Sequence, residues 1–179
     1  MAILRVDDFR GKMAGGGARA NLFEVNVNFP GIAGGDTELT NFMCRAAQLP
    51  GATTGVVETP FRGRMIKFPG DRTFEPFTMT VYNDTNFTIR DSFQRWFNAM
   101  NTHFGNIGLV MDNAGYGTYL CDININQLLQ DGSIAKAYTL RNCFPSAITP
   151  IELSYDQQTA IEEFSITIEY DFWSDDTVQ

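Results

Sequence analysis

The chain lacks any long apolar segment. None of its 179 residues belongs to an uninterrupted run of about 18 apolar side chains, the length that a membrane-spanning helix needs. It begins Met-Ala-Ile-Leu-Arg-Val-Asp-Asp, which has no cationic start followed by an apolar core. We therefore expect no membrane insertion, no secretory signal, and synthesis in a cytoplasm.

Metal-ligating residues are scarce as well. His103 is the only histidine, and the three cysteines, Cys44, Cys121 and Cys143, are far apart with no C-x-x-C spacing. A structural zinc site needs four ligands at paired spacing, so no metal site is expected. The thiols are interpreted as reduced and buried. The alternative is that an unpaired thiol bridges neighbouring subunits of an assembly.

Catalytic patterns are missing too. The sequence contains no G-x-S-x-G, H-E-x-x-H or Walker motif. The acidic pairs Asp7-Asp8, Glu162-Glu163 and Asp175-Asp176 are adjacent in sequence, so on a strand their members point to opposite faces. His103 falls at the end of an expected helix, where its charge complements the helix dipole. The chain is predicted not to be an enzyme and to need no cofactor.

Basic residues are few relative to acidic ones. Thirteen Lys and Arg stand against 21 Asp and Glu, which gives a formal net charge of −8. Affinity for nucleic-acid phosphates needs clustered Lys and Arg that release counterions. Nucleic-acid binding is therefore disfavoured, whereas a surface that repels nucleic acid is compatible with this charge.

What the sequence does contain is a series of alternating apolar and polar segments, typical of half-buried antiparallel strands. Strands are expected at 22–29, 42–48, 54–68, 74–82, 119–127, 136–144 and 162–172, with a shorter one within 105–117. Asp131-Gly132 predicts a hairpin turn, and Pro69-Gly70-Asp71 predicts another turn. The strand 54–68 is either continuous or interrupted near Thr59-Pro60 and Gly63, both of which suit an edge or a bulge.

One helix is expected, over about 88–104. Its apolar side chains form a single stripe at helical spacing. The members of this stripe are Ile89, Phe93, Trp96, Phe97 and Met100. Thr88 and Asp91 resemble a capping box at its start. We predict a single mainly β domain, residues 1–179, of two packed antiparallel sheets in a sandwich or barrel with this one helix capping the core.

Two segments do not show these patterns. Residues 1–20 are rich in glycine and predict a flexible N-terminal arm, whose apolar residues dock on the chain itself or on a neighbour. Residues 31–41 predict a polar loop or short irregular helix, long enough to have a contact role. The strands carry no device that buries their edges, and exposed edges invite pairing with another copy. Ring closure would remove those edges, and polar strand faces would then line a wet channel.

Three segments, in order along the chain, resemble the tail tube proteins of contractile-tailed bacteriophages. They are Gly16–Val25, Phe68–Phe77, and Val81–Asp84 with Phe87–Arg90 leading into the helix of Trp96. The resemblance implies six copies in a ring, whose inner sheets join into one continuous inner β-barrel around a lumen. The hexameric rings stack into a hollow tube inside a contractile sheath, through which DNA is ejected into the host. The protein would be part of the virion, assembled in the host cytoplasm.

The resemblance also implies partners. These are further copies of the chain, the tail sheath protein, and the baseplate and tail terminator proteins; the tape measure protein and DNA pass through the lumen without specific binding. The arm 1–20 and the segment 31–41 would make ring-to-ring contacts. The inner tube of a pyocin-like or type VI secretion particle is an alternative, and a small-ligand-binding β-barrel is a third hypothesis.

An acidic lumen is implied in the same way, because like charge keeps DNA from sticking to the wall. The acidic members of the predicted polar strand faces are the candidates for this lining: Glu24, Asp122, Glu163, Glu169 and Asp171. Inter-subunit bridging by Cys44, Cys121 or Cys143 is outside the resemblance and is a separate hypothesis for this chain.

Overall fold

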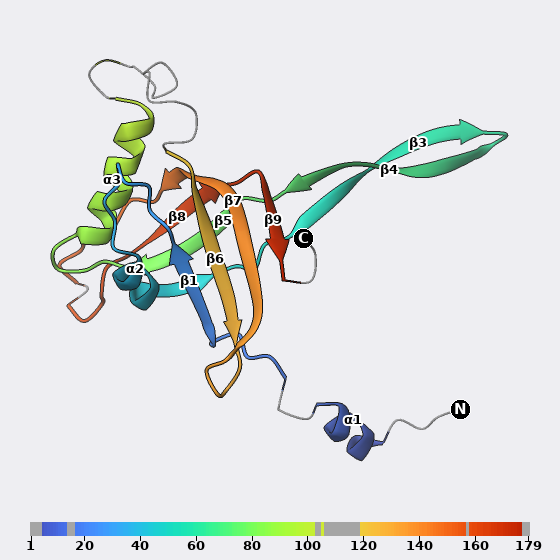
Figure 1. Cartoon of the computed structure of the whole chain (residues 1–179), viewed down its shortest axis with the longest axis horizontal. Coiled ribbons are helices and arrows are strands. Elements are labelled where there is room, and N and C mark those ends of the chain that lie inside the picture. Colours follow the sequence, from blue (N-terminus) through green and yellow to red (C-terminus); the bar gives the residue numbers. More distant parts are fainter. Residues whose placement is uncertain (1–4, 14–16, 103–104, 106–118, 157, 177–179) are drawn as a thin grey trace.

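The structure is a computed structural model that describes residues 5–13, 17–102, 105, 119–156 and 158–176 (Figure 1). Within these ranges the chain forms nine strands and three helices, so the mainly β prediction is confirmed. Helix α1 was not predicted, whereas α2 overlaps the segment 31–41, for which a short irregular helix was one of the two expectations. The helices are α1 (Val6–Lys12), α2 (Thr37–Met43) and α3 (Thr88–Met100). The strands are β1 (Phe23–Val27), β2 (Cys44–Ala47), β3 (Ala52–Phe61), β4 (Arg64–Phe74), β5 (Phe77–Tyr82), β6 (Cys121–Leu128), β7 (Ile134–Ile148), β8 (Glu163–Glu169) and β9 (Phe172–Asp175).

Seven strands form one antiparallel sheet that is bent at β7. The order is β1-β6-β7-β8-β5-β2, and β9 also pairs with β7. The early part of β7 pairs with β6 and β9, and its last part, from Phe144, pairs with β8. Asn142, with φ 57°, is two residues before the point where the pairing changes from β6 to β8. We call β1, β6, β9 and the early part of β7 the first half, and β8, β5, β2 and the last part of β7 the second half.

The core lies between these halves. Strand residues alternate between buried and half-buried along β5, β6 and β8, which confirms the predicted alternation. Fully buried side chains from both halves and from α3 form one cluster; among them are Val25, Val27, Met79, Val81, Phe93, Trp96, Ile123, Ile125, Phe164, Ile166 and Ile168. Each such side chain contributes about 1.5–3 kcal/mol on leaving water. The two halves are therefore held face to face by this shared apolar layer.

Helix α3 closes one end of the core, as the sequence predicted (Figure 1). The ring of Phe29 contacts Phe93 at a centroid distance of 5.1 Å and Trp96 at 6.0 Å. The indole Nε1 of Trp96 donates a hydrogen bond of 2.7 Å to the carbonyl oxygen of Tyr119. Phe97 and Met100 are only partly buried, so the buried stripe is narrower than expected.

The start of α3 differs from the expected capping box. The cap residue is Phe87, in the left-handed region at φ 57°, and its side chain makes no capping bond. The cap is supplied by Asp84, whose Oδ1 accepts a hydrogen bond from the Ile89 amide at 3.4 Å. The helix ends at Met100; residues 103–104 of the predicted helix, His103 and nearly all of the predicted strand within 105–117 lie outside the described residues.

The predicted turn at 69–71 is wrong, and the predicted strand 54–68 is two strands, interrupted at one of the two expected places, Gly63. β3 and β4 form an antiparallel hairpin that turns at Arg62-Gly63, where Gly63 has φ 82°. β4 runs through Pro69-Gly70-Asp71, and the register shifts there, opposite Gly55. A Cβ on Gly70 would lie 3.2 Å from the Gly55 carbonyl oxygen. The glycine in the Pro-Gly-Asp segment therefore serves a close strand approach at a bulge.

Other boundaries shift for local reasons. The predicted strand 42–48 begins only at Cys44, because Phe42 belongs to α2. The predicted strand 162–172 is two strands, β8 and β9, interrupted at 170–171. Phe172 is consequently not on the buried face; it lies opposite Arg141 in the first half and is 48% exposed. The Asp131-Gly132 hairpin turn is confirmed, with Gly132 at φ 82°.

Candidate assembly surfaces

Four of the five predicted luminal acids lie on two different faces of the molecule. Glu24 on β1 and Asp122 on β6 point outward from the first half, because their strand neighbours are buried in the core. Glu163 and Glu169 point outward from the second half for the same reason. Since both halves turn their apolar faces to one core, these outward faces point away from each other. Asp171, between β8 and β9, accepts a 2.6 Å hydrogen bond from Asn142 Nδ2.

The outward face of the first half is rich in amides, and we call it the asparagine face. It comprises Glu24, Asn26, Asp122, Asn124, Asn126, Thr139 and Arg141. Thr139 donates a 3.0 Å hydrogen bond to Asn124 Oδ1. Asp122 is paired with Arg141 at 2.5 Å, so its charge is balanced locally. Among the described residues, Glu24 is the acid of this face without an ion pair.

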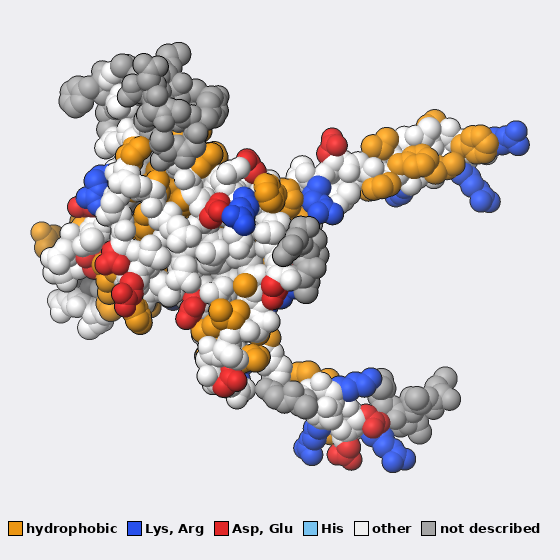
Figure 2. All heavy atoms as spheres, viewed as in Figure 1, with side chains coloured by type: hydrophobic (Ala, Val, Ile, Leu, Met, Phe, Trp, Pro, Cys, Tyr) orange, Lys and Arg blue, Asp and Glu red, His pale blue; other side chains and the backbone are white. Residues whose placement is uncertain are grey.

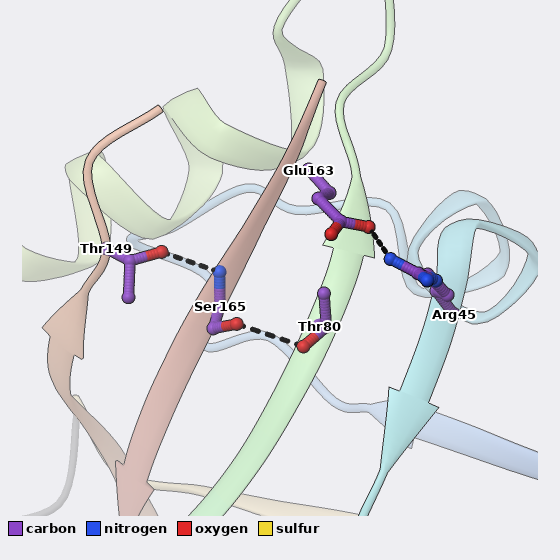
Figure 3. A network of polar contacts seen from close by, with 5 residues as sticks. All are labelled: Arg45, Thr80, Thr149, Glu163 and Ser165. Carbon is purple, nitrogen blue, oxygen red and sulfur yellow. Dashed lines mark hydrogen bonds and ion pairs between the residues drawn. The ribbon is translucent and has the colours of Figure 1, made fainter. Parts of the chain in front are cut away.

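The outward face of the second half is rich in hydroxyl groups, and we call it the hydroxyl face. The cross-strand pairs Thr78–Thr167, Thr80–Ser165 and Tyr82–Glu163 share it with Glu169. Thr80 Oγ1 and Ser165 Oγ are 2.9 Å apart, and the Ser165 amide donates to Thr149 Oγ1 at 2.8 Å (Figure 3). This lattice of small hydroxyls makes the face flat and wettable.

Arg45 is the cation beside the hydroxyl face. Its guanidinium forms an ion pair with Glu163 (Figure 3). It also lies 5.9 Å from the ring centroid of Tyr82. The hydrogen bond that Arg45 donates to the Glu163 carboxylate raises the pKa of Arg45, so this cation stays charged. Glu169, at the other end of the face, has no ion pair with a described residue.

The β3–β4 hairpin projects from the body as a long arm (Figure 1). Six of its large apolar side chains are between 42% and 60% exposed: Val56, Val57, Phe61, Met65, Ile66 and Phe68. The seventh, Phe74 at the base of the hairpin, packs against the core. The register puts Val57, Phe61, Ile66 and Phe68 on one side of the arm. An isolated two-stranded hairpin is marginally stable in water, and an exposed apolar patch of this kind marks an interaction surface.

The arm is also basic in an acidic chain. Between Ala52 and Phe74 it carries four Lys and Arg against two Asp and Glu, whereas the whole chain has a net charge of −8. Arg62 and Arg64 lie at its tip, where Figure 2 shows blue side chains beyond an orange stretch. Glu58 and Lys67 pair at 3.3 Å on the side opposite Ile66 and Phe68. The arm therefore complements the rest of the molecule in charge.

The N-terminal arm contains a second exposed apolar stripe. Val6, Phe9 and Met13 share one side of α1 at spacings of three and four residues, and all three are exposed. No residue of α1 is buried, and the helix lies away from the body (Figure 1). Within the expected N-terminal arm, the described residues thus form a helix that was not predicted from the sequence, although Asp7, Asp8, Arg10 and Lys12 fit the dipole at its two ends.

The segment 31–41 performs a task that the sequence analysis did not foresee. Asp36 caps α2 by accepting a 3.1 Å hydrogen bond from the Leu39 amide. Asn41 Oδ1 then accepts from the Val25 amide at 3.1 Å, and Thr37 donates to the Val27 carbonyl oxygen at 2.7 Å. These two side chains occupy the outer edge of β1. Asp36 followed by Thr37 is a sequence pattern from which the start of α2 could have been predicted.

The three cysteines have different surroundings. Cys121 and Cys143 are buried and lie directly opposite each other on β6 and β7. Cys44, on β2, is partly buried, and burial raises the pKa of its thiol to about 11. No group of three or more His, Cys, Asp or Glu in the described residues is placed to hold a metal ion. In the same ranges, no helix has both the length and the apolar character needed to cross a membrane.

Comparison with known proteins confirms the resemblance seen in the sequence. The family described as "Phage tail tube protein" matches residues 18–176. Tail tube protein gp19 of Enterobacteria phage T4 is 28% identical over 170 residues, covering 94% of this chain and 98% of that protein. The tail tube protein of Serratia phage KSP90 is 27% identical over 170 residues, covering 92% and 93%.

Two solved structures share the fold. The sheath–tube complex of an extracellular contractile injection system (PVC) in the extended state contains a chain with a TM-score of 0.65 and 17% identity, covering 92% of this chain and 95% of that one. The tube-terminating cap of the anti-feeding prophage gives a TM-score of 0.65 and 17% identity, covering 89% and 90%. With the family matched over almost its whole length, the chain belongs to the phage tail tube protein family.

Proposed function

We propose that this protein forms hexameric rings that stack into the hollow tube of a contractile phage tail, through which DNA is ejected. The observation that carries the proposal is the β3–β4 arm, which exposes six large apolar side chains on a hairpin that pairs with no other described strand. Docking of this basic arm on the acidic body of a neighbouring copy would cover those side chains and bring opposite charges together.

The second half of the sheet is the better candidate for the inner barrel. In a barrel built from many copies, each copy supplies a segment of sheet, and that segment must have an unpaired strand edge on both sides. No described strand pairs with the outer edge of β2, or with the outer edge of β7 from Phe144 to Ile148. The outer edge of β1, by contrast, is occupied by Thr37 and Asn41. The first half therefore has one closed side.

The hydroxyl face would then line the lumen. Of the five acidic candidates, Glu163 and Glu169 belong to this face, while Glu24 and Asp122 would lie on the outer side of the ring. Serine and threonine hydroxyls hold water, and carboxylates repel DNA phosphates, so such a wall would let DNA slide without binding. Asp171 lies at the connection between β8 and β9 and belongs to neither face.

The proposed partners follow from the same assembly. The neighbouring structures are described as a sheath–tube complex and a tube terminator. For this chain we propose contacts with a sheath protein, a tail terminator and a baseplate, and passage of the tape measure protein and DNA through the lumen. The exposed stripe of α1 is a candidate surface for ring-to-ring contact.

The tube of an injection particle is a second candidate function, since the fold is shared with such a system. The two candidates differ in cargo: a phage tail carries DNA, and an injection particle lacks a packaged genome. Nuclease-resistant DNA in purified particles would support the phage assignment. The third hypothesis, a small-ligand-binding barrel, requires an open interior, whereas the described interior is filled by the apolar cluster.

Negative-stain microscopy of the purified protein tests the proposal. We expect rings or tubes from the wild-type chain, and dispersed monomers from a variant with Ile66→Asp and Phe68→Asp, because two carboxylates on the apolar side of the arm would oppose its burial. Thr53→Asp, an exposed change at the base of the same hairpin, is the matched control and should still assemble. Wild-type protein that stays monomeric under all conditions would overturn the proposal.

A further inference from the structure

Cys121 and Cys143 are direct cross-strand partners. They are Cα partners in the antiparallel register of β6 and β7, and their exposed fractions are 9% and 0%. Opposed residues in an antiparallel pair have Cα atoms roughly 4.5–5.5 Å apart. A disulfide spans Cα separations of about 4.4–6.8 Å. Backbone placement alone therefore allows a bond between these two sulfur atoms.

The pair lies where the sheet bends. Asn142, with φ 57°, directly precedes Cys143, and Phe144 is the first β7 residue paired with β8. The register also shifts between Cys121 and Ile123, so β6 is irregular at the same point. Such an irregularity lets a strand adjust locally. A surface hollow lined by Leu120, Cys121, Asp122 and Asn142 gives a small reagent access to Cys121.

We propose that Cys121 and Cys143 form an internal disulfide that staples β6 to β7 at this bend when the protein meets a small-molecule disulfide such as oxidised glutathione. The thiolate of Cys121 attacks one sulfur of the reagent and releases one reduced glutathione as a thiolate, which takes up a proton. The thiolate of Cys143 then attacks the mixed disulfide and releases the second glutathione. Two protein thiols are oxidised and one small disulfide is reduced to two thiols.

The surroundings of the two thiols make the oxidation depend on pH and on the redox state of the compartment. Burial raises the pKa of Cys143 to about 12 and raises the pKa of Cys121 as well, so little thiolate exists at neutral pH. Thiol–disulfide exchange is therefore slow at neutral pH. The thiols stay reduced in a reducing compartment, and the bond forms after transfer to an oxidising one. Because the thiolate fraction rises about tenfold per pH unit below the pKa, the oxidation rate should rise by roughly 100-fold from pH 7 to pH 9.

The test uses the full-length protein incubated with oxidised glutathione, then denatured with an alkylating reagent and mapped by mass spectrometry. We expect a peptide in which Cys121 and Cys143 are joined within one chain, with Cys44 alkylated. The bond closes a loop of roughly 20 residues, so the oxidised protein should have a Tm higher by roughly 6–12 °C, lost again on reduction.

Cys44→Ser is the matched control and should retain both the internal bond and the Tm shift. Cys121→Ser and Cys143→Ser should each lose the internal bond and the Tm shift. If either variant fails to fold, the peptide map of the wild-type protein is sufficient to test the proposal. Three results would overturn the proposal: alkylation of all three thiols, glutathione held on Cys121 without further reaction, or a bond between chains. The outcome is independent of tube assembly, because it is measured within one chain.

Discussion

Two side chains of α2 take the place of a neighbouring strand at the outer edge of β1. The Asn41 oxygen accepts from the Val25 amide, and the Thr37 hydroxyl donates to the Val27 carbonyl. An unpaired backbone group that is shielded from water costs about 1–3 kcal/mol. These contacts therefore stabilise the fold and also close an edge at which a second chain could add.

Asn41→Leu should lower the free energy of unfolding by about 1–3 kcal/mol, because the Val25 amide loses its acceptor. Urea unfolding followed by circular dichroism measures the change. Asn98→Leu, at an exposed position of α3, is the matched control and should stay within about 0.5 kcal/mol of wild type. Equal stability of the two variants would contradict the edge-closing role of Asn41.

The carboxyl group of Asp84, which caps the start of α3, should make the stability of the fold depend on pH. Burial raises the pKa of its carboxyl group, but hydrogen bonds from the Thr88 hydroxyl and from the Thr88 and Ile89 amides outweigh this, and the pKa is lowered from the usual 3.8. A lowered folded-state pKa adds stability above the unfolded value, and this stability is lost as pH falls through the folded value.

The urea midpoint of wild type should therefore exceed that of Asp84→Asn at pH 7, and the gap should shrink as pH falls below 3.8. Asparagine keeps the capping oxygen and removes only the ionisation, so the comparison isolates the charge. A gap that stays constant from pH 7 to about pH 2.5 would argue against this role for Asp84.

Among the elements, the β3–β4 arm is separable from the fold. Six of its large apolar side chains are exposed and lie outside the buried cluster, and only Phe74, at the end of β4, packs against that cluster. Replacing residues 53–73 by a short glycine-serine linker should change the free energy of unfolding by less than about 1 kcal/mol and should abolish tubes. Urea unfolding and microscopy measure the two effects.

Helix α3 provides the contrasting element. Trp96→Ala removes the largest fully buried side chain and the hydrogen bond to the Tyr119 carbonyl, which should cost about 3–5 kcal/mol. The arm replacement should therefore remove assembly without unfolding, and the helix variant should unfold the subunit. An arm-free protein that still forms tubes would show that the apolar arm is not an assembly contact.

At the scale of the whole molecule, charge on the hydroxyl face is the property that the proposed tube depends on. Glu169→Lys with Thr167→Lys would put cations on that face in every copy of a ring, where they attract DNA phosphates. We expect tubes of normal appearance with slowed or blocked DNA release. Phage infectivity and ejection assays measure the effect.

Glu24→Lys, on the asparagine face, is the matched control and should leave DNA release unchanged. Normal infectivity of the Glu169→Lys, Thr167→Lys variant would refute the luminal assignment of the hydroxyl face. A block caused by Glu24→Lys alone would instead move the lumen to the asparagine face.

Local pattern was enough to predict most of the secondary structure. The alternation around Val25, Ile123 and Ile166 repeats every second residue and was read correctly as strands with one buried face. The stripe of α3 was visible for the same reason. The β3–β4 arm was not predicted, because both of its sides carry apolar residues. Periodicity alone does not distinguish an apolar side chain in the core from one that contacts another copy of the chain.

The tertiary structure decided what depends on contacts between distant segments. Periodicity shows which side of each strand is apolar, but not which strands pair, so Glu24 and Glu169 were grouped together although they lie on opposite faces. The pairing of Cys121 with Cys143 depends equally on register. The family, the strand content and the excess of acidic residues could be predicted from the sequence, because they depend on local patterns or on composition. The outward faces of the sheet, its free strand edges and its cross-strand residue pairs depend on contacts between distant segments. They are therefore decided only by the tertiary structure.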